Sequence, residues 1–558
     1  MSERETAPVT LEGPPLERDE RYRSILDVFE TACREFATRP AFTCMGHTLD
    51  YRELETLSDR FAHWIVHRTT MAPGERLAIV LPNLLQYPVV VFGALKAGLV
   101  VVNTNPLYTA EEMRHQFEDA GVSGVVIFAH MADRLERVLA HLDIAHVFIT
   151  EVADLHPTPS RLKYNLGARY VTRQVPRYRL PGAVALRRVL KTRGRIDRSR
   201  CGRDDDLAIL QYTGGTTGTP RGAMLSHANL VANMRQTGEV LGSTVDRGRE
   251  TIVAPLPVYH IYTFTVNCMF GCETGSHTIL IPNPKDLDGF VRVLAAQPFS
   301  AFIGLNTLFA ALCRRDDFRR LDFSALKLSV SGGMALNTAT AERWEEVTGS
   351  AVLEGYGMTE TSPVVCVNPP GQLQPGSIGR PVAGTALRVV DDRGSVLGLE
   401  TPGELCVRGP QVMQGYWHLP EESARTLTRD GWVHSGDIAV LQRDGFVRIV
   451  DRKKDMIVTS GFNVYPNEVE DVLLSHDEVY EAAVVGLPDE DSGERVVAYI
   501  VLRHESSLDA ETLKQWCRER LTGYKVPRRF EFRDRLPRSG VGKVLRRALR
   551  DEAAEGRA

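Results

Sequence analysis

Short runs rich in Val, Ile and Leu recur along the first 330 residues and alternate with longer stretches suited to helices. A short strand that is apolar along its whole length is typical of a parallel sheet buried on both faces. The expected strands are 122–130, 206–213, 250–257, 276–282, 301–305 and 326–333. This alternation predicts an α/β chain with doubly wound subdomains.

The most apolar stretch, residues 76–103, could be mistaken for a membrane span. Five residues interrupt it: Pro82, Asn83, Gln86, Pro88 and Lys96. A bilayer helix needs about 20 mainly apolar residues. We therefore expect a strand at 77–81, a helix at 84–97 and a strand at 100–103, which together form a βαβ unit.

The length of the chain and its local composition divide it into several folding units. At 558 residues it exceeds a single core, because domains hold about 150 residues on average. After about residue 365, short strands punctuated by Gly and Pro predict a small β-barrel subdomain that ends near residue 450. From 451 onwards the alternation fits a small, mobile α+β domain. The predicted division is a disordered tail over 1–20, a large region over 21–450 and a C-terminal domain over 451–558.

The overall composition is that of an ordinary globular protein. A formal net charge of −4 and 25% charged residues give the chain no global attraction to nucleic acid. The nine cysteines are scattered, and the closest pair, Cys268 and Cys272, lacks the CxxC spacing of a zinc site. Because the N-terminus is charged and Pro-rich without an apolar segment, a secretory signal is not expected. These features predict a cytoplasmic protein with reduced core thiols.

One segment departs from this balance. Residues 161–203 contain fourteen Lys or Arg residues and one acid, Asp197, with Tyr164, Tyr170 and Tyr178 among them. One interpretation is a patch that rests on an anionic membrane surface, where each base contributes about 1 kcal/mol. A solvated surface loop is an equal alternative, and nucleic acid is a weaker one because no recognition module accompanies the charge.

A dense cluster of Gly and Thr lies at residues 212–225, with the sequence YTGGTTGTPRGAML. The glycines allow backbone N–H groups to turn inward around an anion, the Thr hydroxyls add donors, and Arg221 adds positive charge. The spacing is not that of the common P-loop, in which Gly and four residues precede Gly-Lys-Ser/Thr. The cluster predicts a phosphate-binding loop, with a flexible loop as the alternative.

Five further segments follow this loop: PLPVYHIY at 255–262, LEGYGMTET at 353–361, HSGD at 434–437, DRKKDMIVTSGFNVYP at 451–466 and PRSGVGK at 537–543. In this order they resemble the superfamily of acyl-CoA synthetases, peptide-synthetase adenylation domains and luciferases. The resemblance extends over nearly the whole chain. It is closest to bacterial long-chain fatty acid CoA ligases.

The resemblance implies a two-step activation of a carboxylic acid. The carboxylate attacks the α-phosphate of ATP and releases pyrophosphate, and a thiol then displaces AMP. Both nucleophiles come from substrates, so no catalytic Ser or Cys is required. The implied co-substrates are ATP and coenzyme A, and the implied cofactor is Mg²⁺, which helps to neutralise two approaching anions.

On the phosphate side, the resemblance assigns the β- and γ-phosphates to the Gly–Thr loop. Arg221 stands where the family usually has Lys, so the charge is kept but its geometry differs. Glu360 and Thr216 are the implied Mg²⁺ ligands. An isolated Glu there would more simply be a helix N-terminal acid. The implied loop contacts are Thr213, Gly214, Gly215, Thr216, Thr217, Gly218, Thr219 and Arg221.

On the nucleoside side, Tyr356 is expected to stack on adenine, and Asp437 to accept hydrogen bonds from the ribose hydroxyls with Arg452 nearby. Outside this context they would be a core aromatic and a turn residue. The other implied contacts of the nucleotide and coenzyme A are Gly332, Gly355, Gly357, Thr359 and Gly461.

The resemblance also assigns residues to the reacting groups. His260 is expected where the acyl carboxylate meets the phosphate, and Lys543 is expected to bridge the carboxylate and the α-phosphate. Alone, the His would more often be a core residue and the Lys an idle surface charge. For the second step, the C-terminal domain is expected to swing about a hinge near Lys454 and bring the Gly461 loop toward the pantetheine. The predicted catalytic residues are Thr216, His260, Glu360 and Lys543.

The acyl substrate is the least defined part of the prediction. The segment VYHIYTFTVN around His260 has no acid to pair with an amino group, which favours a substrate without an α-amine. Apolar residues here and at 304–312 indicate an acyl tunnel, or simply core. The main prediction is ligation of a long- or medium-chain fatty acid to coenzyme A. The alternatives are an aryl-CoA ligase, a ligase that loads a carrier protein, and a catalytically silent binder of fatty acid or nucleotide on membranes. Peripheral attachment to the inner face of the membrane and a homodimeric state are left open.

Overall fold

The computed structural model describes residues 7–17, 19–194, 196, 203–213, 220–459, 462–489, 492–503, 506, 508–538 and 544–556. The chain divides into two compact units. The larger unit takes residues 12–386 and 407–433. The smaller takes residues 387–406 and the chain from 434 onwards, with the N-terminal stretch that ends at residue 11.

A seven-stranded sheet in the larger unit has the order β10-β9-β5-β4-β6-β7-β8. From β9 to β8 all neighbours are parallel, and β10 is antiparallel to β9. The strands are β4 (Arg76–Val80), β5 (Val100–Asn103), β6 (Val122–Phe128), β7 (His146–Thr150), β8 (Val184–Ala185), β9 (Leu207–Thr213) and β10 (Arg221–Ser226). The helices of this region are α2 (Tyr51–Arg68), α3 (Gln86–Lys96), α4 (Ala110–Ala120), α5 (Ala132–Leu139), α6 (Thr158–Leu166), α7 (Leu186–Val189) and α8 (His227–Leu241).

Residues 76–103 form β4, α3 and β5, which confirms the predicted βαβ unit. Lys96 is buried at the end of α3, where its Nζ lies 2.6 Å from Asp59 Oδ1 and 3.0 Å from Ser58 Oγ. A buried ammonium is tolerated because a carboxylate and a hydroxyl satisfy it. Nowhere in the described parts of the chain does a helix reach the length and apolar character that a membrane crossing requires.

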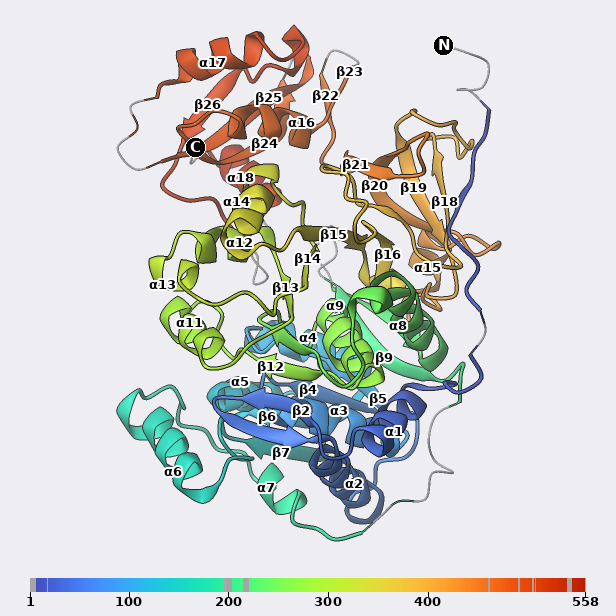
Figure 1. Ribbon diagram of the computed structural model, residues 1–558, viewed down its shortest axis with the longest axis vertical. Helices are drawn as coiled ribbons and strands as arrows, with labels where there is room; N and C mark the ends of the chain where they lie inside the picture. Colours follow the sequence, from blue (N-terminus) through green and yellow to red (C-terminus); the bar gives the residue numbers. More distant parts are fainter. Residues whose placement is uncertain are drawn as a thin grey trace. The chain divides into compact units, whose positions relative to one another are not determined.

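A nine-stranded sheet has the order β17-β16-β15-β14-β13-β11-β12-β2-β3. The run from β15 to β2 is parallel, and β16, β17 and β3 add antiparallel pairs at the two edges. The strands are β2 (Pro40–Cys44), β3 (His47–Asp50), β11 (Thr251–Ala254), β12 (His277–Leu280), β13 (Ala301–Gly304), β14 (Leu328–Gly332), β15 (Val352–Gly357), β16 (Val364–Val367) and β17 (Arg380–Pro381). The helices α11 (Leu287–Ala295), α12 (Asn306–Cys313), α13 (Asp316–Arg319) and α14 (Thr338–Thr348) lie together beside it (Figure 1). Two largely parallel sheets with helices confirm the doubly wound α/β prediction.

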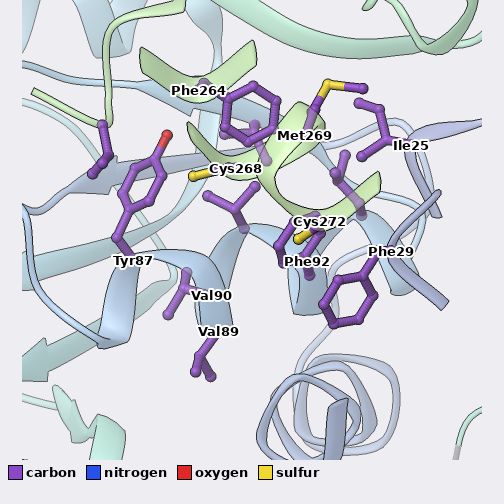
Figure 2. Close-up of a cluster of buried hydrophobic side chains, with 14 of the residues drawn as sticks. Ile25, Phe29, Tyr87, Val89, Val90, Phe92, Phe264, Cys268, Met269 and Cys272 are labelled. Carbon is purple, nitrogen blue, oxygen red and sulfur yellow. The ribbon is translucent and has the colours of Figure 1, made fainter. Parts of the chain in front are cut away.

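Helices α1 (Ile25–Glu35) and α3 meet the segment from α9 (Ile261–Thr263) through the π-helical turn η5 (Phe264–Phe270) to α10 (Gly271–Glu273). Figure 2 shows their apolar side chains turned toward one another, and the rings of Phe29 and Phe92 stack with centroids 4.0 Å apart. The eight cysteines in the described part of the chain are buried and free. Burial raises the pKa of the Cys268 and Cys272 thiols, so they are protonated core residues, as predicted.

The aromatic core beside the nine-stranded sheet bears on residues 304–312, for which an acyl tunnel and simple core were the two interpretations. Phe309 of α12 is fully buried against Phe302 and Trp344, with ring centroids 5.7 and 4.6 Å apart. Leu312 is buried in the same cluster. These two residues of the 304–312 segment are therefore core.

A five-stranded sheet has the order β1-β18-β19-β20-β21. Its strands are β1 (Leu11–Glu12), β18 (Ala386–Val390), β19 (Gly403–Arg408), β20 (Val433–Leu441) and β21 (Val447–Arg452). The pairing of β1 departs from the predicted disordered tail over 1–20 for residues 9–13, while residues 1–6 and 18 lie outside the described residues. The Val9 N–H donates to the Leu397 carbonyl at 3.1 Å, and a backbone that extends a sheet edge gains such bonds whatever its side chains are.

The C-terminal part of the chain forms a separate sheet, β23-β22-β25-β24, with β26 beside β25. Its elements are β22 (Ile457–Thr459), β23 (Phe462–Val464), α16 (Pro466–Leu474), β24 (Val479–Asp489), β25 (Gly493–Leu502), α17 (Ala510–Arg518), β26 (Arg529–Phe532) and α18 (Arg546–Ala554). A buried Arg546 ties α18 to α16, because its Nη2 lies 2.8 Å from Glu470 Oε2. This is the α+β arrangement that the sequence predicted.

Candidate active site

The Gly–Thr loop connects two paired strands of the larger unit. Thr213 ends β9, Arg221 begins β10, and these two residues are direct antiparallel partners. The pairing therefore fixes both ends of the loop close together. The loop residues Gly214, Gly215, Thr216, Thr217, Gly218 and Thr219 lie outside the described residues.

Arg221 contacts two side chains from the segment around α15 (Pro420–Thr426). Its Nη1 lies 3.0 Å from Glu422 Oε2, and its guanidinium carbon lies 5.6 Å from the centroid of the Tyr416 ring. A planar cation can pair with a carboxylate and lie over an aromatic face at the same time, whereas a Lys ammonium is a point charge. Arg at this position therefore links the loop to Tyr416.

Tyr416 in turn contacts Glu360. Its hydroxyl donates to Glu360 Oε1 at 2.7 Å, in a buried position. Burial and the nearby Glu360 carboxylate raise the pKa of Tyr416, so the phenol keeps its proton and remains a donor. Arg221, Tyr416 and Glu360 thus form one continuous contact chain beside the loop.

The backbone holds this chain of contacts in place. The Met224 N–H donates to the Gly415 carbonyl at 2.9 Å, and the Trp417 N–H donates to the Gly222 carbonyl at 2.8 Å. The Met413 N–H donates to the Glu360 carbonyl at 2.8 Å. Residues 413–417 therefore connect β10 to the turn that carries Glu360.

Glu360 lies in the 3₁₀ turn Thr359–Thr361 after β15 and is 9% exposed. Among the described residues, its carboxylate accepts only the Tyr416 hydrogen bond, and no group of three His, Cys, Asp or Glu forms a metal cluster there. Mg²⁺ commonly takes one or two carboxylates and completes its shell with phosphate oxygens and water. A buried carboxylate with one remaining oxygen fits that requirement.

The glycines predicted to contact the nucleotide lie on adjacent strands. Gly332 of β14 is the register partner of Gly355 of β15. A Cβ at Gly332 would lie 3.0 Å from the Tyr262 ring, and a Cβ at Gly357 would lie 2.0 Å from the Pro363 carbonyl oxygen. Packing requires these two glycines. At Gly355 the nearest atom would be at an ordinary 3.5 Å, so internal packing does not explain a glycine there.

Tyr356 is partly exposed between these glycines, and Thr359 begins the following turn. In the same strand, Glu354 is partly buried, and its Oε1 accepts the Leu336 N–H at 3.1 Å. Burial raises the pKa of Glu354 to about 7, because a single backbone donor does not offset the loss of water. A titrating carboxyl therefore lies two residues from Tyr356.

His260 caps α9, and its Nδ1 accepts the Tyr262 N–H at 3.3 Å. The Tyr262 hydroxyl is buried and has no hydrogen-bond partner among the described groups. A buried polar atom of this kind costs about 1–3 kcal/mol unless water or a ligand satisfies it. The segment after His260 therefore offers a donor that the protein itself does not use.

A buried polar chain leads from α3 to the His260 segment. Tyr87 donates to Asn103 at 2.9 Å, Asn103 to Gln211 at 3.1 Å, and Gln211 to the Tyr259 carbonyl at 3.2 Å. These residues could not be selected from the sequence, because each is a single polar side chain in an apolar strand or helix. The chain couples β5 and β9 to the segment that carries His260.

In the smaller unit, Asp437 of β20 lies opposite Arg452 of β21. Arg452 Nε is 2.8 Å from Asp437 Oδ1, and the Asp437 side chain is 6% exposed while that of Arg452 is 48% exposed. The structure thus brings together the two residues predicted on the ribose side. Gly461 and Lys543, predicted to act in the same part of the chain, lie outside the described residues.

Tyr416 and Glu422 are the contacts that sequence reasoning missed. They lie in the segment QGYWHLPEE at 414–422, which follows a β-rich region and resembles an ordinary turn. The signal available in the sequence was Gly415 beside two aromatic residues. In the structure this glycine has a φ of 137°, a backbone conformation that favours glycine at a close turn. That signal does not specify which acid an aromatic hydroxyl will reach.

Comparison with known proteins gives concordant results. The AMP-binding enzyme family model matches residues 29–417, and the AMP-binding enzyme C-terminal domain matches residues 468–543. A long-chain-fatty-acid–CoA ligase of Escherichia coli O157:H7 is 48% identical over 536 residues, covering 96% of this chain and 95% of that protein. The ligase of the same name from Bacillus subtilis is 34% identical, covering 96% and 95%.

Solved structures agree with the fold. ATP-bound MatB from Rhodopseudomonas palustris has a TM-score of 0.82 and 27% identity, covering 96% of this chain and all of that one. The first family match contains β9, β10, Glu360 and Tyr416. The chain therefore belongs to the AMP-binding enzyme family.

Proposed function

We propose that this protein joins a long- or medium-chain fatty acid to coenzyme A at the expense of ATP, through an acyl-adenylate. The observation that carries the proposal is the 48% identity, over 96% of the chain, to a long-chain-fatty-acid–CoA ligase. The buried Glu360, placed beside the ends of the Gly–Thr loop by Tyr416 and Arg221, supports the same chemistry.

In the first step, a carboxylate oxygen of the fatty acid forms a bond to the α-phosphorus of ATP, and pyrophosphate leaves. In the second, the sulfur of coenzyme A bonds to the acyl carbon, the thiol proton is released, and AMP leaves. Both steps bring anions or electron-rich atoms together, so orientation and charge neutralisation are the protein's contribution.

The phosphate-side residues have distinct roles in this proposal. The loop from Thr213 to Thr219 and Arg221 hold the β- and γ-phosphates, and Glu360 with Thr216 would hold Mg²⁺. When bound, Mg²⁺ would offset the negative charge of the phosphates. Tyr416 orients Glu360 by its hydrogen bond, and Glu422 orients Arg221. His260 lies at the carboxylate end of the acyl group.

The remaining assignments follow the same proposal. Tyr356 stacks on adenine while Gly332, Gly355, Gly357 and Thr359 line its surroundings, and Asp437 with Arg452 receives the ribose hydroxyls. Lys543 bridges the carboxylate and the α-phosphate. The C-terminal domain from residue 451 moves about Lys454 between the two steps and presents the Gly461 loop to pantetheine.

The proposal is tested by pyrophosphate release from purified protein across a series of saturated acids of increasing length, with and without coenzyme A. We expect release with long or medium acids and a thioester only when coenzyme A is present. No release with any fatty acid would leave a catalytically silent binder as the better description.

An aryl-CoA ligase is a second candidate, because a feruloyl-CoA synthase of an Amycolatopsis species is 32% identical over 509 residues. Including ferulate and benzoate in the same series separates the two, since an aryl ligase would favour these acids over the saturated chains. A ligase that loads a carrier protein would release pyrophosphate yet form no thioester with free coenzyme A. The anionic membrane surface proposed as a partner of residues 161–203 requires a test of its own.

A further inference from the structure

An apolar stripe lies on the outward side of α6 and the π-helical turn η2 (Gly167–Val171). Leu162, Leu166, Tyr170 and Val171 are 48, 51, 69 and 80% exposed. These four, here called the α6–η2 face, are a third of the twelve large apolar side chains that are exposed in the described parts of the chain. Such clustering within ten residues differs from the scattered apolar side chains of an ordinary surface.

The stripe has a regular spacing. Leu162, Leu166 and Tyr170 follow at steps of four, which places them along one side of a helical segment. No residue of α6 or η2 is buried. The apolar side chains are therefore not held in the protein's own core, unlike those of α3, all of whose residues are buried.

Other side chains anchor this segment to the protein. Asn165 donates to Asp154 at 3.1 Å and accepts the Ala153 N–H at 2.9 Å, and Arg169 Nη2 lies 2.5 Å from Glu151 Oε1. The Tyr164 ring meets the edge of the His156 ring with centroids 5.9 Å apart. These contacts tie the segment to the protein through its polar and ring side chains, while the exposure of the four apolar residues shows that the α6–η2 face is directed away from the core. Figure 1 shows α6 at the margin of the larger unit.

The stripe lies in a part of the chain that is rich in positive charge. Between Asp154 and Asp197 the sequence contains eleven Lys or Arg residues and no acid. Lys163, Arg173, Arg177 and Arg188 are exposed. An exposed apolar stripe within a basic segment is typical of helices that lie in the interface plane of an anionic bilayer.

We propose that the α6–η2 face docks on an anionic lipid bilayer. The four apolar side chains enter the boundary between headgroups and acyl chains, and the exposed bases of this part of the chain bind lipid phosphates. Charge disfavours a second copy of the chain as the occupant, because two such faces would bring two sets of bases together. This inference does not depend on ligase activity.

The test is cosedimentation of the full chain with vesicles of phosphatidylcholine alone or with 30% phosphatidylglycerol. We expect binding to the mixed vesicles only, weakened by 0.5 M salt because screening shortens the reach of the bases. The triple variant R173Q/R177Q/R188Q should bind at least tenfold more weakly, since each base contributes about a fivefold factor near an anionic surface. L162Q/L166Q should lose at least fivefold while keeping the same charge.

Two matched variants control for general effects. R249Q/K285Q/R320Q removes three exposed bases elsewhere on the larger unit, and L373Q replaces an apolar side chain that is 39% exposed. Both should bind within twofold of the parent. The melting temperature of each variant, measured by circular dichroism without vesicles, reports that it is folded.

Equal vesicle binding by the parent and both α6–η2 variants would overturn the proposal, as would no binding of the parent to mixed vesicles. Dimerisation of the parent in sedimentation equilibrium that L162Q/L166Q abolishes would assign the face to a second copy instead. Failure of the ligase assay with vesicle binding intact would count against the proposed function and not against this surface.

Discussion

Glu360 and Asp437 are both buried carboxylates, yet their partners differ in kind. Glu360 meets a neutral donor, the Tyr416 hydroxyl at 2.7 Å, whereas Asp437 meets the Arg452 cation at 2.8 Å. A carboxylate with a neutral partner keeps its full charge for an added cation, while one paired with Arg is already neutralised. The environments thus suit Glu360 to a metal and Asp437 to hydroxyl donors, which matches the roles proposed for them.

The largest expected effect tests the Glu360 half of this contrast. E360Q keeps the size and an acceptor for Tyr416 but removes the charge, so adenylation should fall about 10³-fold. The measurement is pyrophosphate release, together with calorimetric binding of ATP at several Mg²⁺ concentrations. The exposed Glu342 provides the control E342Q, which should match the parent. An E360Q rate within fivefold of the parent would show that charge at this position is not required.

The role proposed for Asp437 predicts a different kinetic result. D437N should raise KM for ATP about 10²-fold, because it removes an acceptor and leaves the Arg452 guanidinium without its buried partner. Its Mg²⁺ dependence should stay that of the parent, since this carboxylate is already paired. The control is D477N at an exposed site of the same unit. A changed Mg²⁺ requirement in D437N would erase the distinction between the two carboxylates.

Glu354 is a third carboxyl to compare with Glu360 and Asp437. Among the described residues, neither a hydroxyl nor a cation is its partner. Its pKa rises to about 7 from the ordinary 4.5, so between these pH values the folded protein holds a proton that the unfolded chain releases. Stability from this site is present at low pH and is lost as the pH rises through about 7, by roughly 2–3 kcal/mol in full.

E354Q removes that loss because Gln is neutral at every pH. The melting temperature of E354Q should equal that of the parent near pH 4.5 and exceed it at pH 8. A scan of melting temperature from pH 4.5 to 8 measures the difference, with E342Q as the control at an exposed site. A difference that is constant with pH would mean that Glu354 does not titrate in this range.

Tyr416 tests whether the neutral donor matters for Glu360. Y416F keeps the ring beneath Arg221 and removes only the hydroxyl, so it should slow pyrophosphate release about tenfold by leaving the carboxylate less firmly oriented. Y170F changes an exposed Tyr and serves as the control. Unchanged release in Y416F would separate Tyr416 from Glu360 in function despite their contact.

Much of this architecture could be predicted from the sequence, because apolar strand runs and helix-length spacers carry their own pattern. The βαβ unit at 76–103 is such a case. Every residue of β5 and α3 is buried on all sides, so the sequence there does not alternate between apolar and polar residues. The strand β1 could not be predicted, since its stabilisation comes from backbone pairing with a distant sheet.

The candidate site shows the same limit. Thr213, Arg221 and Glu360 could be selected because a glycine-rich loop and a following acid have a recognisable order. Tyr416 could not, because nothing local indicates that residue 416 will lie between residues 221 and 360. Contacts between segments almost 200 positions apart depend on how β10 pairs with residues 414–417, and that is a property of the fold.

The smallest expected effect concerns Arg221, at the position where the resemblance described above leads us to expect Lys. R221K keeps a cation for Glu422 but removes the planar face over Tyr416, so release should fall two- to fivefold, whereas R221Q should cost more than tenfold. A double-mutant cycle of R221K with Y416F measures whether the two residues act together. If R221K equals the parent, the stacking contributes nothing and Arg221 is an interchangeable phosphate cation. If R221K is as impaired as E360Q, the guanidinium fork itself is required, and the contact chain to Glu360 is more than a positioning device.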